Sequence, residues 1–551
     1  MKKILLGLLV LIILASGAFI YLLKGRSSKV ISTKYNEFSF ICEADDVDKS
    51  LFDRIDGQYY LALDFIKDKI DKDVDYNENE KIITFANDKG TKRIKVGEMK
   101  MLQNGIEVAL RDPVIEKDNK IFVPIEAFIY DYPVELRYID DLKLLIMDYT
   151  NINYAKGTLK GQGTNLREEA SLQSPIVKNL QGNEEILVFG EEGDFYKVRI
   201  KDGYKGYIKK DLLEVDFGSG KFSTIKDTVT TEAKRPLNLT WDYTYSTQSD
   251  ASIAAISPIE GLEVICPTWF SIGNENGDLI DRGKMEYVTK YKSLGIDVWG
   301  YLDNSFDPNI TEATLKSPTK REYIINQVIR ALNYYGMKGL NIDFEHTKID
   351  SRDDITQFTK EIAARLKQHG IKVSIDVTPQ ISKDVTKEPY DRVNLSKHVD
   401  YVMLMAYDQH WGSSTKAGSV AEYKWVEGNI NNLIRQIPRD KFILCIPTYT
   451  RIWTEKPDGS VSSTTASMAA VQDIIAKRGL TPKFDEVAKQ NYVQYQDNDG
   501  LKKIWIEDNS SIEHKLTLIN KYNLGGVASW RKGFETSSVW PLIKNTVINW
   551  Q

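Results

Sequence analysis

Residues 338–345 have the sequence KGLNIDFE, a short apolar segment in which polar side chains occupy every second position from Asn341 onward. In a β-strand this alternation places Asn341, Asp343 and Glu345 on the same face. Two carboxylates on the face of a buried strand are costly unless a partner or a chemical task accompanies them. Residues 339–345 are therefore predicted to form a strand that ends at a functional site.

Similar β-rich apolar segments alternate with amphipathic helical segments from Pro236 to the end of the chain. Continuous apolar runs such as YVMLMAY (401–407) are typical of parallel strands covered on both faces. Eight strands alternating with helices predict an α/β fold, a (β/α)8 TIM barrel over residues 236–551. The long interval before the last strand predicts an inserted subdomain around Trp453 to Trp505. The predicted strands are residues 237–243, 262–270, 296–302, 339–345, 372–378, 400–407, 442–449 and 525–530.

Polar and aromatic side chains gather at the C-terminal ends of these strands, where the active site of such a barrel lies. This mixture is typical of a carbohydrate site, because the flat faces of sugars stack on aromatic rings and their hydroxyls bind carboxylates. The residues at the strand ends are Trp269, Asp303, Glu345, Asp376, Tyr407, Asp408, Tyr449 and Trp530.

Four motifs along the barrel resemble those of glycoside hydrolase family 18, the chitinase-like enzymes. KGLNIDFE is similar to the D-G-x-D-x-D-x-E signature of that family. The segments SIDVTP (374–379), MAYDQHW (405–411) and ASW (528–530) follow in the family's order. Within the family these motifs look most like the spore-cortex fragment-lytic branch, whose members resemble N-acetylglucosaminidases acting on peptidoglycan.

The resemblance implies a retaining glycosidase that uses substrate-assisted catalysis. Glu345 matches the general acid that protonates the leaving glycosidic oxygen. The 2-acetamido carbonyl of the substrate then attacks the anomeric carbon, so an enzyme nucleophile is not required. Asp343 matches the residue that orients the acetamide and stabilises the oxazolinium-like intermediate, and Tyr407 matches a hydroxyl donor to the acetamide oxygen.

Further positions are expected to bind the substrate. The resemblance makes Trp530 the aromatic floor under the reacting sugar and Asp408 a nearby sugar-binding carboxylate. Asn341 stands where most members have aspartate, and we expect its amide to hydrogen-bond Asp343 and to alter the pH profile without abolishing activity. Lys338 replaces the first aspartate of the signature, a structural position. The full set of expected substrate-binding residues is Trp530, Asp408, Asn341, Trp269, Asp303 and Tyr449.

Two alternatives to peptidoglycan cleavage remain open at this stage. One is a chitinase that acts on chitin oligomers by the same chemistry. The other is a chitinase-like lectin that binds amino-sugar polymers without cleaving them. Such lectins typically lose the acid, so the presence of Glu345 favours catalysis. In each case the predicted partner is an amino-sugar polysaccharide, either peptidoglycan or chitin.

The N-terminus predicts export of the chain. Residues 4–23 are uncharged and mostly apolar, a length that matches the hydrocarbon core of a bilayer. Residues 1–29 are therefore predicted to hold one transmembrane helix, with the catalytic domain outside the membrane. A cleaved signal is the alternative, because small residues occupy positions 15–18, although the apolar run continues beyond them.

Two small domains are predicted between the anchor and the barrel. Residues 59–85 and 121–147 share a pattern of strand, short helix and two strands, which predicts a duplicated α+β domain over 34–150. This region resembles the copper amine oxidase N-terminal domain, but it contains no histidine and no copper site is predicted.

Residues 155–215 resemble a bacterial SH3-like β-barrel, with Phe195, Tyr196, Tyr204 and Tyr207 as core or groove aromatics. Residues 216–235 are predicted to be a linker, because they are polar, contain glycine and show little periodicity.

Composition narrows the range of functions. The 551 residues carry a formal net charge of −5, so nucleic acid is not a predicted partner. The three cysteines, Cys42, Cys266 and Cys445, are too scattered for a disulfide framework or a zinc cluster. The five histidines all lie at or beyond His346, which argues against a histidine-rich metal site. Neither a metal nor another cofactor is predicted.

Overall fold

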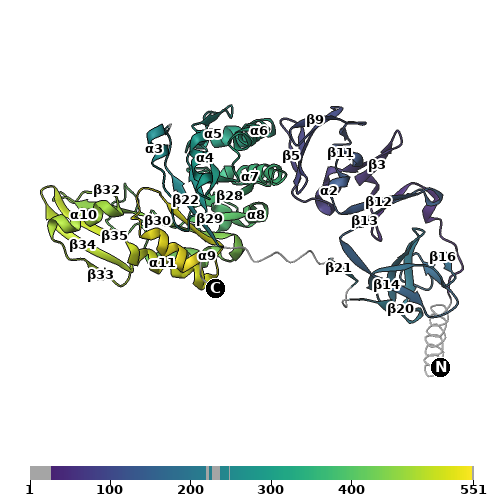
Figure 1. Cartoon of the computed structure of the whole chain (residues 1–551). Coiled ribbons are helices and arrows are strands. Elements are labelled where there is room, and N and C mark those ends of the chain that lie inside the picture. The colour runs from purple at the N-terminus through teal and green to yellow at the C-terminus, as the bar shows by residue number, and fades with distance from the viewer. Residues whose placement is uncertain (1–26, 219–221, 226–235, 247, 549–551) are drawn as a thin grey trace, which may run out of the picture. The chain divides into compact units, whose positions relative to one another are not determined.

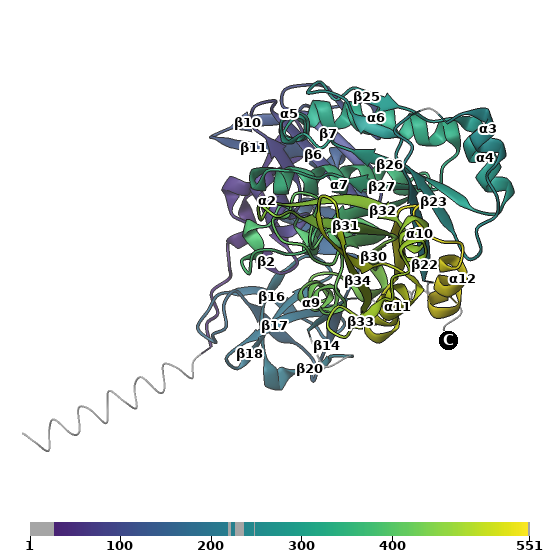
Figure 2. The same cartoon turned by 90° about the vertical axis from the view of Figure 1, so that its left-hand side faces the viewer.

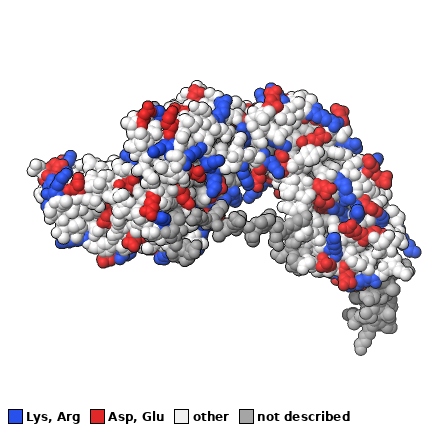
Figure 3. Space-filling view, viewed as in Figure 1, with Lys and Arg blue, Asp and Glu red and all other residues white. Residues whose placement is uncertain are grey.

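The structure is a computed structural model that describes residues 27–218, 222–225, 236–246 and 248–548 (Figure 1). These residues form two compact units. The described residues of the first lie in the chain up to Val74, in Val96–Met99 and in Ala109–Thr231, and those of the second lie in Asp75–Lys95, Lys100–Val108 and Glu232–Gln551. Both signs of charge occur on the surface of each unit (Figure 3), as expected for 73 basic and 78 acidic residues.

The second unit contains the predicted barrel. Its strands are hydrogen-bonded in the order β23-β22-β36-β30-β29-β28-β27-β26, and pairing of β23 with β26 closes the ring. Every pairing in the ring is parallel. All eight strands coincide with predicted ones, which confirms the TIM barrel. Their bounds are β22 (Leu237–Asp242), β23 (Val264–Pro267), β26 (Asp297–Asp303), β27 (Gly339–Asp343), β28 (Lys372–Val377), β29 (Tyr401–Met405), β30 (Phe442–Pro447) and β36 (Gly526–Trp530).

Amphipathic helices cover the outside of the ring (Figure 1). The longest, α6, begins where the Ser317 side chain accepts a hydrogen bond from the Lys320 N–H, and it ends at Gly336 with φ of 63°. Its buried face repeats at four-residue spacing through Ile324, Val328 and Leu332, which join the core between helices and strands. The principal helices are α4 (Met285–Ser293), α5 (Pro308–Leu315), α6 (Pro318–Tyr335), α7 (Arg352–Lys367), α8 (Arg392–His398), α9 (Tyr423–Leu433) and α11 (Asn509–Tyr522).

The predicted insertion between the last two barrel strands is confirmed and faces the viewer in Figure 2. It is an antiparallel sheet in the order β32-β31-β35-β34-β33, covered by one helix. Trp453 is fully buried there and donates its indole N–H to the Gly418 carbonyl at 2.8 Å. The elements are β31 (Tyr449–Glu455), β32 (Val461–Ser467), α10 (Met468–Arg478), β33 (Lys483–Asp485), β34 (Gln490–Asp497) and β35 (Gly500–Ile506).

One sheet of the predicted 34–150 domain belongs to the barrel unit, which differs from the predicted boundary. The reason is a buried ion network, through which β6 and β7 pack on α7. Arg93 donates to Glu322 and, at 2.5 Å, to Glu361, and Arg321 also donates to Glu361 and to Asp75. The strands of this sheet are β5 (Asp75–Asn77), β6 (Ile82–Asn87), β7 (Gly90–Lys95), β8 (Lys100–Gln103) and β9 (Ile106–Ala109).

Replacing Glu361 by alanine is expected to lower the free energy of unfolding of the barrel unit by about 3 kcal/mol. The change leaves Arg93 and Arg321 buried without their shared carboxylate. Urea denaturation followed by tryptophan fluorescence measures the effect. Glu312→Ala is the control, because Glu312 forms exposed pairs with lysines and its removal is expected to leave stability almost unchanged. Equal, small effects of the two variants would contradict the role of the network.

The first unit holds the rest of the small domains. The first copy of the duplicated pattern is β4 and α2 followed by β5 and β6, two strands that belong to the barrel unit. The second copy is β11, η3, η4, β12 and β13, with 3-10 turns in place of the helix. Strands β4 and β11 pair with each other across the duplication. The bounds are β4 (Gln58–Ala62), α2 (Leu63–Lys69), β11 (Lys120–Pro124), η3 (Ile125–Ala127), η4 (Ile129–Asp131), β12 (Val134–Ile139) and β13 (Leu144–Tyr149).

The SH3-like region is an eight-stranded sheet running from β14 (Ile152–Leu159) to β21 (Ser223–Ile225). Phe195 is buried, whereas Tyr196, Tyr204 and Tyr207 are half-buried. Because β21 pairs with β14, part of the predicted linker belongs to this sheet, and residues 226–235 of it lie outside the described residues.

Within the described part of the chain, no helix has both the length and the apolar character needed to cross a bilayer. The predicted anchor, residues 4–23, lies outside that part.

Candidate active site

A cavity of about 850 Å³ opens at the C-terminal ends of the barrel strands. Asp343 ends β27, Trp530 ends β36, and Glu345 and Tyr407 follow their strands closely, so all four side chains line it. The cavity therefore brings together the three predicted catalytic residues and the predicted aromatic floor. Its aromatic lining consists of Trp241, Tyr243, Tyr245, Tyr301, Phe306, Tyr407, Trp411, Trp425 and Trp530.

The Asp343 carboxyl group is almost fully buried in the cavity wall. Its Oδ2 accepts a hydrogen bond of 2.6 Å from the Tyr301 hydroxyl, and its Oδ1 has no hydrogen-bond partner among the described residues. Burial raises the pKa of Asp343 well above its usual value, and the nearby charges of Glu345 and Asp376 raise it further. Asp343 thus lies in the cavity wall with one oxygen held by Tyr301 and the other unpartnered among the described residues.

The position of Glu345 is fixed through its backbone. The Glu345 N–H donates to the Asn304 side-chain oxygen at 3.2 Å, and the Asn304 amide donates to the Glu345 carbonyl at 2.8 Å. Burial raises the pKa of the Glu345 carboxyl, which His346 partly opposes and Asp408 reinforces. A raised pKa suits a group that must donate a proton near neutral pH.

Tyr407 and Asp408 form the adjoining wall after β29. Burial raises the pKa of Tyr407 well above its usual range, so the phenol stays protonated and can donate a hydrogen bond. The Asp408 carboxylate accepts hydrogen bonds from the Tyr449 hydroxyl at 2.6 Å and from Arg451 at 3.1 Å. These two residues hold Asp408 against the cavity.

Trp530 is packed against other rings of the site. Its ring centroid lies 6.0 Å from that of Trp241 and 6.4 Å from that of Tyr243, the latter edge-on at 88°. The Trp530–Arg531 peptide bond is cis. These neighbours fix Trp530 in the cavity wall, where a sugar ring can stack on it.

Four predicted substrate-binding residues do not line the cavity: Trp269, Asp303, Tyr449 and Asn341. Trp269 is fully buried in the core between Tyr287 and Tyr335, because β23 ends at Pro267 and the alternation no longer holds beyond it. The prediction that Trp269 contacts the sugar is therefore wrong.

Asp303 is also fully buried, where it accepts hydrogen bonds from Tyr245 at 2.9 Å and from Ser271 at 3.0 Å. Tyr449 acts through Asp408 as described above. Both residues support the cavity from behind instead of lining it.

Asn341 is fully buried beneath the cavity and makes a different contact from the expected one. Its side-chain oxygen accepts from the Trp241 indole N–H at 2.9 Å, and its Nδ2 donates to Asp376 at 2.8 Å and to Ser374 at 3.1 Å. The expected hydrogen bond to Asp343 is absent, because the amide nitrogen points to the neighbouring strand β28.

Sequence reasoning missed several lining residues. Tyr301 lies on β26 two positions before Asp303, so the alternation that identified Asp343 was a signal for it. Tyr243 and Tyr245 follow β22 in a loop, and Trp425 lies on α9, where strand alternation gives no information.

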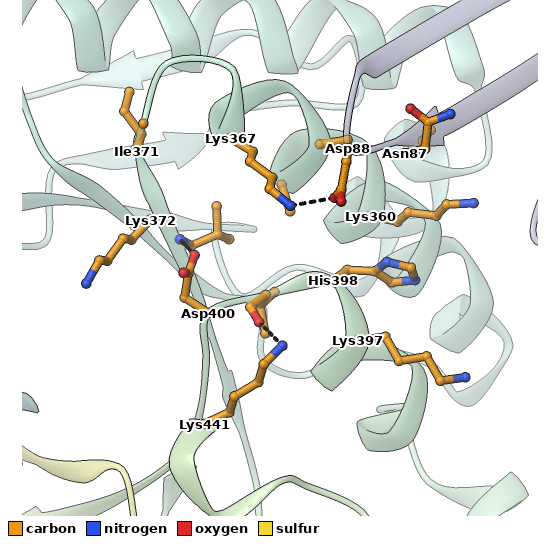
Figure 4. A pocket seen from close by; sticks show the side chains of 16 residues that line it. Asn87, Asp88, Lys360, Lys367, Ile371, Lys372, Lys397, His398, Asp400 and Lys441 are labelled. Atoms are coloured by element: carbon orange, nitrogen blue, oxygen red, sulfur yellow. Dashed lines mark hydrogen bonds and ion pairs between the residues drawn. The ribbon is translucent and has the colours of Figure 1, made fainter. Parts of the chain in front are cut away.

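A second cavity of about 370 Å³ lies at the opposite, N-terminal ends of β28, β29 and β30 (Figure 4). Lysines are prominent in its lining, but Lys367 is paired with Asp88 at 2.5 Å. Lys441 donates to the carbonyls of Ser396 and Val399 at the end of α8. These contacts are structural, so we place the chemistry in the larger cavity.

Comparison with known proteins agrees with this geometry. Residues 283–534 match the model of glycosyl hydrolases family 18. This match covers most of the barrel. Residues 162–214 match the bacterial SH3 domain, and residues 47–141 match the copper amine oxidase N-terminal domain. The resemblances inferred from the sequence are thereby confirmed.

Curated relatives support a glycosidase. The chain is 27% identical over 282 residues to the uncharacterized glycosylase YvbX of Bacillus subtilis (strain 168), covering 49% of this chain and 80% of that protein. It is 24% identical over 251 residues to the cortical fragment-lytic enzyme of the same organism, covering 44% of this chain and 58% of that protein. The chain thus spans little more than half of the length of the second relative.

Solved structures share the fold. The spore cortex-lytic enzyme SleL of Bacillus cereus is 20% identical with a TM-score of 0.52, covering 59% of this chain and 76% of that one. A chitinase of Chromobacterium violaceum is 20% identical with a TM-score of 0.50, covering 57% of this chain and all of that one. At these identities the likeness shows the fold alone. The family match and the curated relatives support a glycosidase.

Proposed function

We propose that the family 18 domain cleaves β-linked N-acetylglucosamine in peptidoglycan, of the cell wall or the spore cortex, with retention of configuration. The observation that carries this proposal is the convergence of Glu345, Asp343 and Tyr407 on one cavity with Trp530 in its wall. An acid, a second carboxyl group, a hydroxyl donor and a stacking ring are what an N-acetylated sugar requires for substrate-assisted cleavage.

In this mechanism Glu345 gives its proton to the glycosidic oxygen as the bond from that oxygen to the anomeric carbon breaks. The acetamide oxygen of the same sugar forms the new bond to the anomeric carbon from the opposite face. Asp343 lies where its free oxygen can accept the acetamide N–H and offset the positive charge that develops. A water molecule then attacks the anomeric carbon and opens the cyclic intermediate, while Glu345 takes up a proton from that water. This second inversion at the anomeric carbon restores the original configuration.

The relatives named cortical fragment-lytic enzymes support peptidoglycan as the substrate. Chitin oligomers are the second candidate. The aromatic side chains of Trp411 and Tyr243 are 57% and 51% exposed at the cavity, and they suit a linear chain of hexosamines without peptides.

We also propose that the catalytic domain works outside the cell membrane. The support is the apolar stretch of residues 4–23, which fits a single-pass anchor or, alternatively, a cleaved export signal.

Product analysis tests the proposed substrate. The full chain is incubated with purified vegetative wall, spore cortex and chitin, and the released fragments are identified by mass spectrometry. We expect fragments with N-acetylglucosamine at the new reducing end from at least one peptidoglycan. Release from chitin alone would move the assignment to the chitinase alternative, and release from none of the three would overturn the proposal.

A further inference from the structure

A third carboxylate, Asp376, lies beside the two predicted catalytic acids. It is 1% exposed near the end of β28, next to β27, and it lines the same cavity as Asp343 and Glu345. Its Oδ1 accepts the 2.8 Å hydrogen bond from Asn341. The Trp241 indole N–H donates to the oxygen of the same amide. This second hydrogen bond fixes the orientation of the amide, so that its nitrogen points toward Asp376.

The surroundings of Asp376 contain acids and neutral groups. Among the described residues that line the cavity there is no lysine or arginine, and His346 is the one basic side chain. Burial raises the pKa of the nearby thiols and phenols well above their usual values, which keeps them neutral. The titratable groups that interact with Asp376 are Asp343, Glu345, Tyr390, Tyr407, Cys266 and Cys445.

We propose that Asp376 is a positioning residue that, held by the Asn341 amide, sets how tightly Asp343 and Glu345 bind their protons. This inference rests on the proposed function and extends it to a residue of the adjacent strand. Burial raises the pKa of Asp376 as well, and the hydrogen bond from Asn341 opposes that shift by favouring the charged form. The three carboxyl groups therefore titrate as one cluster, in which a charge on any member disfavours a charge on the other two. The cluster therefore holds its proton more tightly than an isolated acid would, which suits the transfer from Glu345.

The cost of burying Asp376 supports a role beyond structure. A carboxylate buried without a cation is expensive, and an amide or apolar side chain would fill the same space at lower cost. Position 341 of the motif lacks a carboxyl group, and the neighbouring strand supplies one within hydrogen-bonding distance. By donating this hydrogen bond, the Asn341 amide favours the charged form of Asp376 against the effect of burial.

The test is a set of charge-exchange variants in the full chain, assayed by the pH dependence of kcat/KM. Asp376→Asn removes the charge, so both limbs of the profile are expected to move about one pH unit lower and activity at pH 7 to fall about tenfold. Asn341→Asp adds a charge and is expected to move the limbs higher. The double variant Asn341→Asp/Asp376→Asn moves the carboxyl group from β28 to β27 and keeps the number of acids the same. It is expected to restore the wild-type limbs of the pH profile.

Ser374→Ala is the matched control, because it removes another partner of the Asn341 amide without changing charge. We expect its limbs to coincide with those of the wild type. Unshifted limbs in Asp376→Asn would overturn the proposal, as would a double variant that folds but keeps the shifted profile. If Asp376→Asn does not fold, the Asn341→Asp variant decides the matter by itself. An unshifted pH profile of Asn341→Asp would then overturn the proposal. A wild-type chain that cleaves no glycan would instead contradict the proposed function.

Discussion

Replacement of Glu345 by glutamine is expected to lower kcat on an N-acetylglucosamine glycan by about 1,000-fold, with the dissociation constant for the glycan almost unchanged. Glutamine keeps the size and the hydrogen-bonding capacity of the side chain but has no acidic proton. The leaving oxygen would then depart without a proton from position 345, as an alkoxide, which is a poor leaving group.

Asp350→Asn is the matched control for this variant. Asp350 lies five positions further along the chain and is exposed, so the same chemical change there is expected to leave kcat unaffected. Turnover by reducing-end release and binding by calorimetry give the two quantities separately. Equal turnover by Glu345→Gln and wild type would remove Glu345 from the role of acid.

Replacement of Asp343 by asparagine is expected to lower kcat by about 100- to 1,000-fold. The free Asp343 oxygen is the group placed to accept the acetamide N–H and to offset the charge of the cyclic intermediate. An asparagine side chain keeps the hydrogen bond from Tyr301 but carries no charge, so the loss should fall on kcat more than on KM.

Asp242→Asn serves as the comparison, since Asp242 is also a buried aspartate at the end of a barrel strand. Its carboxylate accepts a 2.6 Å hydrogen bond from Tyr287, the same distance as in the Tyr301–Asp343 pair, but it does not line the cavity. We expect Asp242→Asn to change stability more than kcat. A similar loss of kcat in both variants would indicate that Asp343 supports the fold instead of the reaction.

The barrel was predictable because its strands are covered on both faces. Continuous apolar runs and two-residue alternation follow from that burial, so KGLNIDFE and its seven counterparts indicated strands independently of tertiary contacts. The same alternation placed Asp343 and Glu345 together, and strand ends placed Tyr407 and Trp530 beside them. These parts of the site depend on local geometry.

The remaining parts depend on contacts between distant segments. A strand that continues past Pro267 predicts Trp269 at the cavity, whereas the strand ends at Pro267 and the tertiary structure places Trp269 in the core. The partner of Asn341 lies on another strand, so the sequence offered Asp343 as the nearer acceptor. The sheet from β5 to β9 joins the barrel through Arg93 and its two glutamates, a pairing over more than 200 residues that no local pattern reveals.

Dependence of cleavage on the substrate's own acetamide group tests the central claim most directly. Two chromogenic β-linked oligosaccharides are compared, identical except that one carries N-acetylglucosamine and the other unacetylated glucosamine at the reacting position. The proposed mechanism predicts rapid cleavage of the acetylated compound, with retention of configuration, and a loss of at least about 1,000-fold for the other, because the attacking oxygen is missing. Cleavage of both compounds at similar rates would contradict it.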